Sequence, residues 1–267
     1  MTTTFSEIAS RYERDSIVQK SAADPLFSLL AIGGGDDVLD LGCGAGNLTR
    51  KIRELTTGRV VGVDPSAGML REAEARRAGL EMEFLPADAE SLEFRDCFDV
   101  IFCNSAFQWM RKPRLALGNC LAALRKGGRM GIQAPARREY SPNFIDALRA
   151  VAEDPRTGPT FAGFRPPWLF LESADDYRAL FEEAGFSVPF ARIEEVRMRR
   201  TPDEVFSIFG SGAAAGYLNG EYYPNPPDPS YSETFNEIIH DEFRRQAGSD
   251  GMVDLLFYRI YLLAVKE

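Results

Sequence analysis

The sequence predicts an α/β fold in which helices cover both faces of a mostly parallel β-sheet. Short apolar runs alternate with helical stretches from residue 38 to residue 133, as expected when each strand returns through a helix to the next. A glycine-rich turn, Gly42 to Gly46, follows the first apolar run. Such turns are typical of the point where a parallel sheet binds a ligand.

The expected elements follow from hydrophobic periodicity and from the residues that end each run. Residues 3–31 have helical spacing, and Gly33 to Gly35 end that segment. The Lys126-Gly127-Gly128 run is expected to break the helix before the fifth strand. The expected strands are Val38–Leu41, Arg59–Val63, Met82–Leu85, Phe98–Cys103 and Met130–Gln133, and the helices between them are Leu48–Leu55, Ala67–Ala78 and Arg114–Leu124.

The pattern changes after Pro135. Residues 141–170 are rich in proline, glycine and aromatic residues, whereas Ala174–Glu183 predicts a helix. Two late strands are expected at Phe186–Arg199 and Leu255–Val265. We therefore divide the chain into residues 1–135, which hold N-terminal helices and a ligand-binding core, and residues 136–267, which hold the remaining core strands and an inserted helical and loop lid at about 136–170 and 202–250. A separate domain is the less favoured alternative, because core strands flank the inserts.

Composition limits the classes of function. The 267 residues carry a formal charge of −9, which disfavours nucleic-acid binding. The N-terminus is polar, and no apolar run approaches the roughly 20 residues of a membrane span, so we expect a cytoplasmic protein with no membrane partner. The cysteines have no metal-ligand spacing and are expected to be small buried residues: Cys43, Cys97, Cys103 and Cys120.

The glycine loop is the strongest single motif. Its glycines, Gly42, Gly44 and Gly46, allow the backbone to turn sharply and lie directly against a ligand. A nicotinamide or flavin site is the main alternative, but its fingerprint is G-x-G-x-x-G, and here the third glycine comes one residue early. Asp40 precedes the loop at a position where it could hold a cationic amino group.

Acidic residues follow the next two strands. Asp64 can accept both ribose hydroxyls of a nucleoside, or it can cap the helix that begins at Ala67. Asp88 can accept a hydrogen bond from an exocyclic adenine amine.

Five runs in this order resemble class I S-adenosylmethionine-dependent methyltransferases: V-L-D-L-G-C-G-A-G at 38–46, G-V-D-P-S at 62–66, A-D-A-E at 87–90, F-D-V-I-F-C-N-S-A-F-Q-W at 98–109 and L-R-K-G-G-R at 124–129. The resemblance implies a Rossmann-like seven-stranded sheet whose last strand, Leu255–Val265, lies antiparallel beside the fifth. It also implies S-adenosyl-L-methionine as cofactor, S-adenosyl-L-homocysteine as product, and no metal. The residues implied in cofactor binding are Asp40, Gly42, Cys43, Gly44 and Gly46 along the methionine part, Asp64 and Pro65 at the ribose, Met69, Asp88 and Ala89 at the adenine, Asn104 on the methionine side, and Tyr12 and Gln19 from the first helix.

The acceptor is expected to be a small organic molecule. The sequence has one histidine, His240, in an expected helix, and a carboxylate is an acceptor that needs no general base. The segment Asn104–Trp109 resembles trans-aconitate and malonyl-[acyl-carrier protein] methyltransferases, which implies O-methylation of an acid, free or carried on an acyl carrier. Carbon, nitrogen, hydroxyl and protein acceptors, or loss of catalysis, remain alternatives, and no catalytic residue is assigned. The candidate substrate contacts are Trp109, Arg137, Arg138, Arg165 and Tyr217, with packing or a solvated surface position as the alternative for Trp109 and the arginines.

Overall fold

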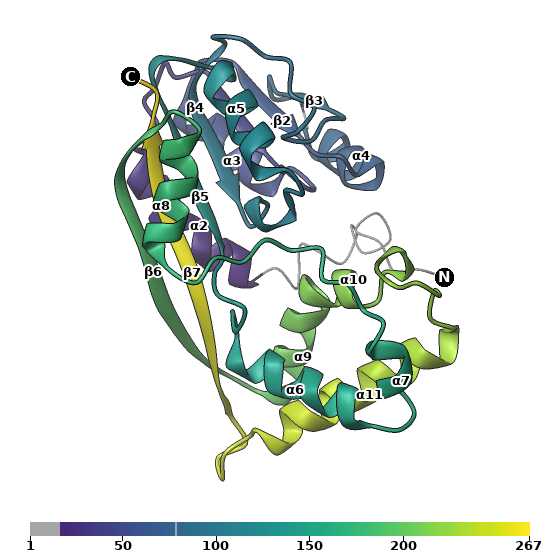
Figure 1. The fold of residues 1–267 in the computed structure, drawn as a ribbon. Coiled ribbons are helices and arrows are strands. Elements are labelled where there is room, and N and C mark those ends of the chain that lie inside the picture. The colour runs from purple at the N-terminus through teal and green to yellow at the C-terminus, as the bar shows by residue number, and fades with distance from the viewer. Residues whose placement is uncertain (1–16, 78) are drawn as a thin grey trace. The chain divides into compact units, whose positions relative to one another are not determined.

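The computed structural model describes residues 17–77 and 79–267, and its centre is a seven-stranded sheet of order β3-β2-β1-β4-β5-β7-β6 (Figure 1). The first five strands in the chain pair in parallel, and β7 pairs antiparallel with β5. The predicted seven-stranded, mostly parallel sheet and the antiparallel position of the last strand are therefore confirmed. The strands are β1 Val38–Leu41, β2 Val60–Val63, β3 Glu83–Leu85, β4 Phe98–Asn104, β5 Leu124–Pro135, β6 Ser187–Arg200 and β7 Val253–Val265.

The described chain divides into two compact units. The first, called the sheet unit, comprises Val18–Arg138, Trp168–Glu194 and Arg259–Glu267, and the second, called the helical unit, includes Glu139–Pro167 and Glu195–Tyr258. The sheet unit holds α2 Ile17–Leu30, α3 Asn47–Leu55, α4 Ala67–Arg76, η1 Phe107–Trp109, α5 Pro113–Ala123 and α8 Ala174–Glu183. The helical unit holds α6 Pro142–Glu153, α7 Gly158–Phe161, α9 Pro202–Gly210, α10 Ala213–Tyr217, η2 Gly220–Tyr222 and α11 Pro229–Arg245.

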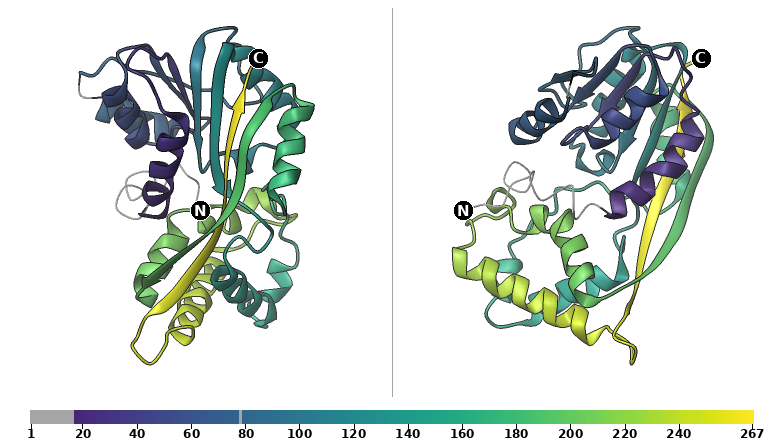
Figure 2. Two further views of the ribbon diagram at one scale, coloured as in Figure 1. Left: turned by 90° about the vertical axis from the view of Figure 1, so that its left-hand side faces the viewer. Right: turned by 180° about the vertical axis from the view of Figure 1, so that it is seen from behind.

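Helices lie on both faces of the sheet (Figure 2), and alternation along the strands turns apolar side chains toward each face. Val38 and Phe102 pack with residues of α2 and α3 on one face. Leu39 and Ile101, one position further along each strand, pack with residues of α5 and α8 on the other. The parallel strands are thus buried on both sides, which explains their nearly continuous apolar sequence.

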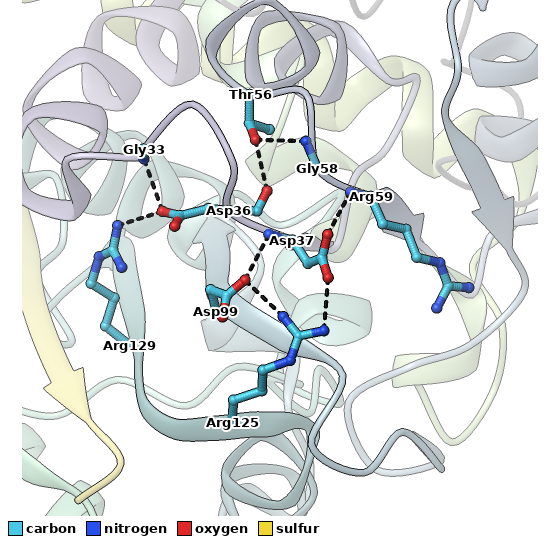
Figure 3. A network of polar contacts seen from close by, with 9 residues as sticks. All are labelled: Gly33, Asp36, Asp37, Thr56, Gly58, Arg59, Asp99, Arg125 and Arg129. Atoms are coloured by element: carbon cyan, nitrogen blue, oxygen red, sulfur yellow. Dashed lines mark hydrogen bonds and ion pairs between the residues drawn. The ribbon is translucent and has the colours of Figure 1, made fainter.

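Ion pairs occupy the edge of the sheet where the parallel strands begin (Figure 3). The Arg125 guanidinium binds Asp37 and Asp99, each at 2.7 Å, and Arg129 binds Asp36 at 2.7 Å. The hydrogen bond from Arg125 is one physical reason that the pKa of Asp37 is lowered, against the opposing effect of burial. Structural charge pairs therefore fill this edge, and the carboxyl ends of the strands remain for a ligand.

The helical unit has an aromatic core of its own. Phe144 stacks edge-to-face on Phe209 at 5.1 Å, and Phe209 lies 6.2 Å from both Tyr217 and Phe235. The sequence predicts lid segments at about 136–170 and 202–250, whereas the compact helical unit includes residues 139–167 and 195–258. The role of this unit as a lid stays a prediction.

Several element boundaries differ from the expected ones by one or two residues, and the start of β5 differs by more. Helix α4 ends at Arg76, and β5 begins at Leu124, so that Gly127 and Gly128 lie within a strand. The physical reason for the longer strand is pairing with the chain end: Gly127 N–H donates to the Lys266 carbonyl at 2.7 Å, and Lys266 N–H donates to the Gly128 carbonyl at 2.9 Å. Over residues 17–77 and 79–267, no helix has the length and apolar character required to cross a membrane.

Candidate functional site at the carboxyl edge of the sheet

The glycine loop uses left-handed backbone at each of its three glycines. Gly42, Gly44 and Gly46 have φ of 79°, 53° and 78°. A Cβ on Gly42 would lie 2.3 Å from the Ala106 Cβ, so this glycine allows the turn after β4 to pack against the loop. A Cβ on Gly44 would meet no described atom within 4 Å, so the backbone there is open to a ligand.

Asp64 ties the end of β2 to this loop. Its Oδ2 accepts the Gly44 N–H at 3.0 Å, and its Oδ1 accepts the Ser66 N–H at 2.8 Å. Burial raises the pKa of Asp64, and the two backbone donors oppose that rise. The helix cap that was the alternative for Asp64 belongs to Ser66, whose hydroxyl accepts the Met69 N–H at 3.3 Å. Asp64 therefore shapes the loop, and each carboxylate oxygen retains a second lone pair for a ligand hydroxyl.

Asp40 is the buried charge of the site. Its Oδ2 accepts the Thr49 hydroxyl at 2.6 Å, which links the end of β1 to the first turns of α3. Burial raises the pKa of Asp40 to about 7, the Thr49 hydrogen bond lowers it, and the neighbouring Asp64 charge raises it. A cationic ligand group beside Asp40 would favour the ionised carboxylate, which burial alone disfavours. Cys43 is buried beside these acids, and burial raises the pKa of its thiol.

The predicted adenine contacts come from two elements. Asp88 is exposed and forms a turn in which its Oδ1 accepts the Ser91 N–H at 2.8 Å. Ala89 and Met69 are both buried, whereas Pro65 is exposed. The turn after β3 thus presents an exposed carboxylate next to the buried Ala89, which suits the polar edge of a base.

The turn after β4 contains buried acceptors. Asn104 is 8% exposed and Gln108 is 7% exposed, and neither Asn104 Oδ1 nor Gln108 Oε1 has a hydrogen-bond partner among the described residues. Ser105 holds this turn in left-handed backbone, at φ 57°, by donating to Gln133 twice: from N–H to the carbonyl at 2.7 Å and from the hydroxyl to Oε1 at 2.9 Å. Orphaned acceptors of this kind indicate a place for a ligand donor.

The site residues expected from the sequence did not include Ser105, Gln108 or Gln133. Ser105 and Gln108 stand beside Asn104 in the turn, but Gln133 lies in β5, 28 residues after Ser105, and is brought there by the parallel pairing of β4 with β5. The polar residue that ends the fifth apolar run was the one available signal.

The predicted substrate contacts are divided between the two units. Trp109 lies in the sheet unit, where its ring is 5.5 Å from that of Trp168. Arg137, in left-handed backbone at φ 67°, and Arg138, whose exposed side chain lies 3.9 Å from Glu172, belong to the same unit. Arg165 and Tyr217 belong to the helical unit; Arg165 is exposed, and Tyr217 is buried in the aromatic core.

Two expected cofactor contacts fall in the N-terminal segment. Tyr12 lies outside the described residues, and Gln19 lies in α2 at a position where the side chain is not described.

The one histidine of the sequence lies in the helical unit. His240 Nε2 lies 2.7 Å from Asp203 Oδ1, and its ring stacks on Phe206, all within the helical unit. In the part of the chain that the structure describes, no group of three or more His, Cys, Asp or Glu residues could hold a metal ion. Cys43, Cys103 and Cys120 are buried as expected, whereas Cys97 is half-buried.

The site fits a ligand that carries an ammonium group and hydroxyls, as S-adenosylmethionine does. The features that fit it are the open backbone at Gly44, the buried acid Asp40 and the Asn104 oxygen without a partner among the described residues. This set offers acceptors for cationic and hydroxyl donors at the ends of β1, β2 and β4. The glycine spacing of the loop, G-x-G-x-G, also departs from the G-x-G-x-x-G fingerprint of a dinucleotide site.

Comparison with known proteins assigns residues 38–128 to a family described as a methyltransferase domain. A trans-aconitate 2-methyltransferase of Enterobacter sp. (strain 638) is 32% identical over 246 residues, 92% of each chain. A malonyl-[acyl-carrier protein] O-methyltransferase of Anoxybacillus flavithermus is 25% identical over 264 residues, which cover 97% of this chain and 93% of the relative. The crystal structure of YcgJ from Bacillus subtilis superposes with a TM-score of 0.62 at 18% identity, over 93% of this chain and 99% of that one, and so shares the fold.

Proposed function

This chain belongs to the S-adenosylmethionine-dependent methyltransferases, and on that premise we propose that it transfers the methyl group to a carboxylate of a small organic acid. The cofactor supplies a sulfonium methyl group that is already activated for displacement. The protein then has to bind, align and shield the reactants, which needs no metal and no covalent intermediate.

The cofactor would be held by the residues at the carboxyl edge of the sheet. In this proposal Asp64 accepts the ribose hydroxyls, Asp40 neutralises the ammonium group, and Asn104 Oδ1 accepts from the methionine part. The support is the open backbone at Gly44 and the position of both carboxylates beside it, since Asp64 binds the Gly44 N–H and its charge raises the pKa of Asp40. The remaining proposed contacts are Gly42, Cys43, Gly44, Gly46, Pro65, Met69, Asp88, Ala89, Tyr12 and Gln19.

The carboxylate acceptor rests on the similarity to two relatives, one named for trans-aconitate and the other for malonyl-[acyl-carrier protein]. This chain matches each of them over more than nine-tenths of the relative's length. The chemistry of the site agrees with that acceptor. A carboxylate is ionised at neutral pH, so its oxygen can attack the methyl group without a general base. The single histidine is engaged with Asp203 in the helical unit, which is consistent with a reaction that does not use it.

Arginines would position the acid in this proposal. Arg137, Arg138 and Arg165 follow the fifth strand in sequence, and a guanidinium can donate two parallel hydrogen bonds to a carboxylate. Replacement of each by alanine should show which one binds substrate, through a raised KM at unchanged cofactor affinity. Two aromatic residues among the candidate contacts, Trp109 and Tyr217, would help to exclude water from the reacting methyl group.

The test is methyl transfer from cofactor labelled in its methyl group to a panel of acids. The panel contains trans-aconitate, the dicarboxylate glutaconate, the monocarboxylate trans-2-pentenoate and malonyl-[acyl-carrier protein]. A methyl ester releases labelled methanol in mild base, whereas methyl groups on carbon or nitrogen stay attached. Base-labile label in one of these acids supports the proposal. Base-stable label in these acids, or no transfer to any of them, overturns it in favour of another acceptor.

A further inference from the structure

The turn after β4 contains a side-chain amide that the turn itself uses only in part. Gln108 lies in η1 and is 7% exposed, and its Nε2 donates to the Ser105 carbonyl at 2.9 Å. Its Oε1 is buried and has no hydrogen-bond partner among the described residues. Exchanging the two ends of the amide would set that oxygen against the Ser105 carbonyl, where two acceptors repel each other. The oxygen is therefore the end of the amide that is left for a donor from a ligand.

The main chain around Gln108 is fixed on both sides. The Gln108 carbonyl accepts the Leu169 N–H at 2.8 Å. The preceding residue, Phe107, is fully buried, and its ring lies 5.4 Å from that of Phe181. These contacts hold the amide in place. A buried acceptor without a partner is unfavourable, so a rigid one indicates a place where a ligand supplies the donor.

A second amide in the same turn is arranged in the same way. Asn104 Nδ2 donates to the Ser105 hydroxyl at 3.5 Å, and that hydroxyl donates to Gln133 Oε1 at 2.9 Å. Asn104 Oδ1 is the second buried oxygen of the turn without a partner among the described residues. Both amides thus direct their N–H groups into the turn and leave their oxygens. Two amide oxygens carry partial negative charge, which suits a cationic group and disfavours a carboxylate.

The turn is placed beside the glycine loop, within the sheet unit. A Cβ on Gly42 would lie 2.3 Å from the Ala106 Cβ, and Asn104 is two residues beyond Phe102, the partner of Asp40 in β1. The proposed adenine, ribose and ammonium contacts follow β3, β2 and β1, and β4 is the next strand in the sheet. The turn after β4 therefore lies beside the methionine part of the cofactor, on the side away from the ribose. The cationic groups of that part are the ammonium group and the sulfonium that carries the methyl group.

We propose that Gln108 Oε1 contacts the sulfonium methyl group of the cofactor and orients it for transfer. Hydrogens on a carbon beside a positive sulfur are polarised, so they can donate weak C–H···O hydrogen bonds to the amide oxygen. In the reaction the acceptor oxygen bonds to the methyl carbon while the C–S bond breaks and its electron pair stays on sulfur. Holding the methyl group keeps these three atoms in line. This inference rests on the proposed placement of the cofactor and does not depend on which acceptor receives the methyl group.

The experiment measures binding to the cofactor-free protein by calorimetry, with three ligands that differ at the sulfur position. S-adenosylmethionine has the charged sulfonium and its methyl group, and S-adenosylhomocysteine has a neutral thioether. Sinefungin has a carbon bearing an amine there, which brings N–H donors. Gln108→Met removes the oxygen and keeps the length of the side chain. Relative to S-adenosylhomocysteine, its affinity should fall by about two- to fivefold for S-adenosylmethionine and by about tenfold or more for sinefungin, and kcat should fall.

Gln133→Met is the matched control, because it makes the same substitution at a buried amide whose oxygen already accepts the Ser105 hydroxyl. Loosening of the turn should weaken all three ligands by one factor and so leave the ratios unchanged. Gln108→Glu retains an acceptor oxygen, and its ratios should equal or exceed those of wild type. This variant keeps the inference testable if Gln108→Met does not fold, since ratios below wild type would contradict it.

The possible outcomes separate this inference from the proposals on which it depends. Unaltered ratios in folded Gln108→Met overturn the role of Gln108, and equal weakening of all three ligands assigns it to the ammonium group or to the turn. If wild type binds none of the three ligands, or if Asp64→Ala leaves all three affinities unchanged, the proposed placement of the cofactor falls and this inference with it. If only the acid panel fails, the carboxylate acceptor falls and the role of Gln108 stands.

Discussion

Replacing Asp40 with asparagine should stabilise the cofactor-free protein at alkaline pH and weaken cofactor binding. Asp40 is buried, and its pKa is raised from 3.8 to about 7, chiefly by burial and further by the charge of Asp64. A carboxyl whose pKa is raised on folding favours the folded state at low pH, and that contribution is lost as the pH rises through the folded-state pKa. Asparagine removes the charge and retains an oxygen that can accept the Thr49 hydroxyl.

The magnitude follows from the two pKa values. Each pKa unit corresponds to about 1.4 kcal/mol, so the interval from 3.8 to about 7 sets an upper limit of about 4 kcal/mol on the effect above neutral pH. Between about pH 5.5 and about pH 8.5, the difference in unfolding free energy between Asp40→Asn and wild type should grow by about 2 kcal/mol. In the proposed complex the cofactor's ammonium group would compensate the charge of Asp40, so the variant should bind cofactor about tenfold more weakly or worse.

Urea unfolding of the cofactor-free proteins, followed by tryptophan fluorescence, measures this difference. Both tryptophans, Trp109 and Trp168, lie in the sheet unit together with Asp40, so the signal reports the unit that changes. Asp24→Asn, at an exposed carboxylate paired with Lys51, is the control and should leave the pH dependence unaltered. Parallel stability-versus-pH curves for Asp40→Asn and wild type would refute the reasoning.

Three further predictions concern the same edge of the sheet. Asp64→Ala should weaken cofactor binding by about tenfold or more, measured by calorimetry, because the proposed ribose contacts and the Gly44 and Ser66 N–H bonds would be lost together; unchanged affinity would remove the ribose assignment. Gly44→Val should abolish cofactor binding in a folded protein, judged by circular dichroism, since its side chain would enter the open space beside the loop; retained tight binding would contradict the loop assignment. Replacing Cys97 and Cys103 by alanine or serine should preserve activity, and zinc bound stoichiometrically to wild type and lost on mutation would overturn that expectation.

The sequence alone determined the sheet and much of the cofactor loop, because both depend on local rules. Buried parallel strands produce uninterrupted apolar runs such as Val60–Val63, and a sharp turn against a ligand requires the glycines at 42, 44 and 46. The two acids that meet at this loop were also visible, since the carboxyl ends of parallel strands lie at one edge. Features set by neighbouring residues in the chain were therefore predictable. The exact end of a helix was less so, since α4 ends two residues before the expected end.

Only the tertiary structure decided which distant side chains share a site. Gln133 comes 28 residues after Ser105, and its sequence surroundings resemble those of any strand. Strand register sets it beside Asn104, and register depends on pairing across the sheet rather than on neighbours in the chain. Burial is settled by the same packing: Arg138 is exposed and Arg259 is enclosed, although the two side chains are chemically identical. The desolvation of a charged group is thus a property of the assembled sheet.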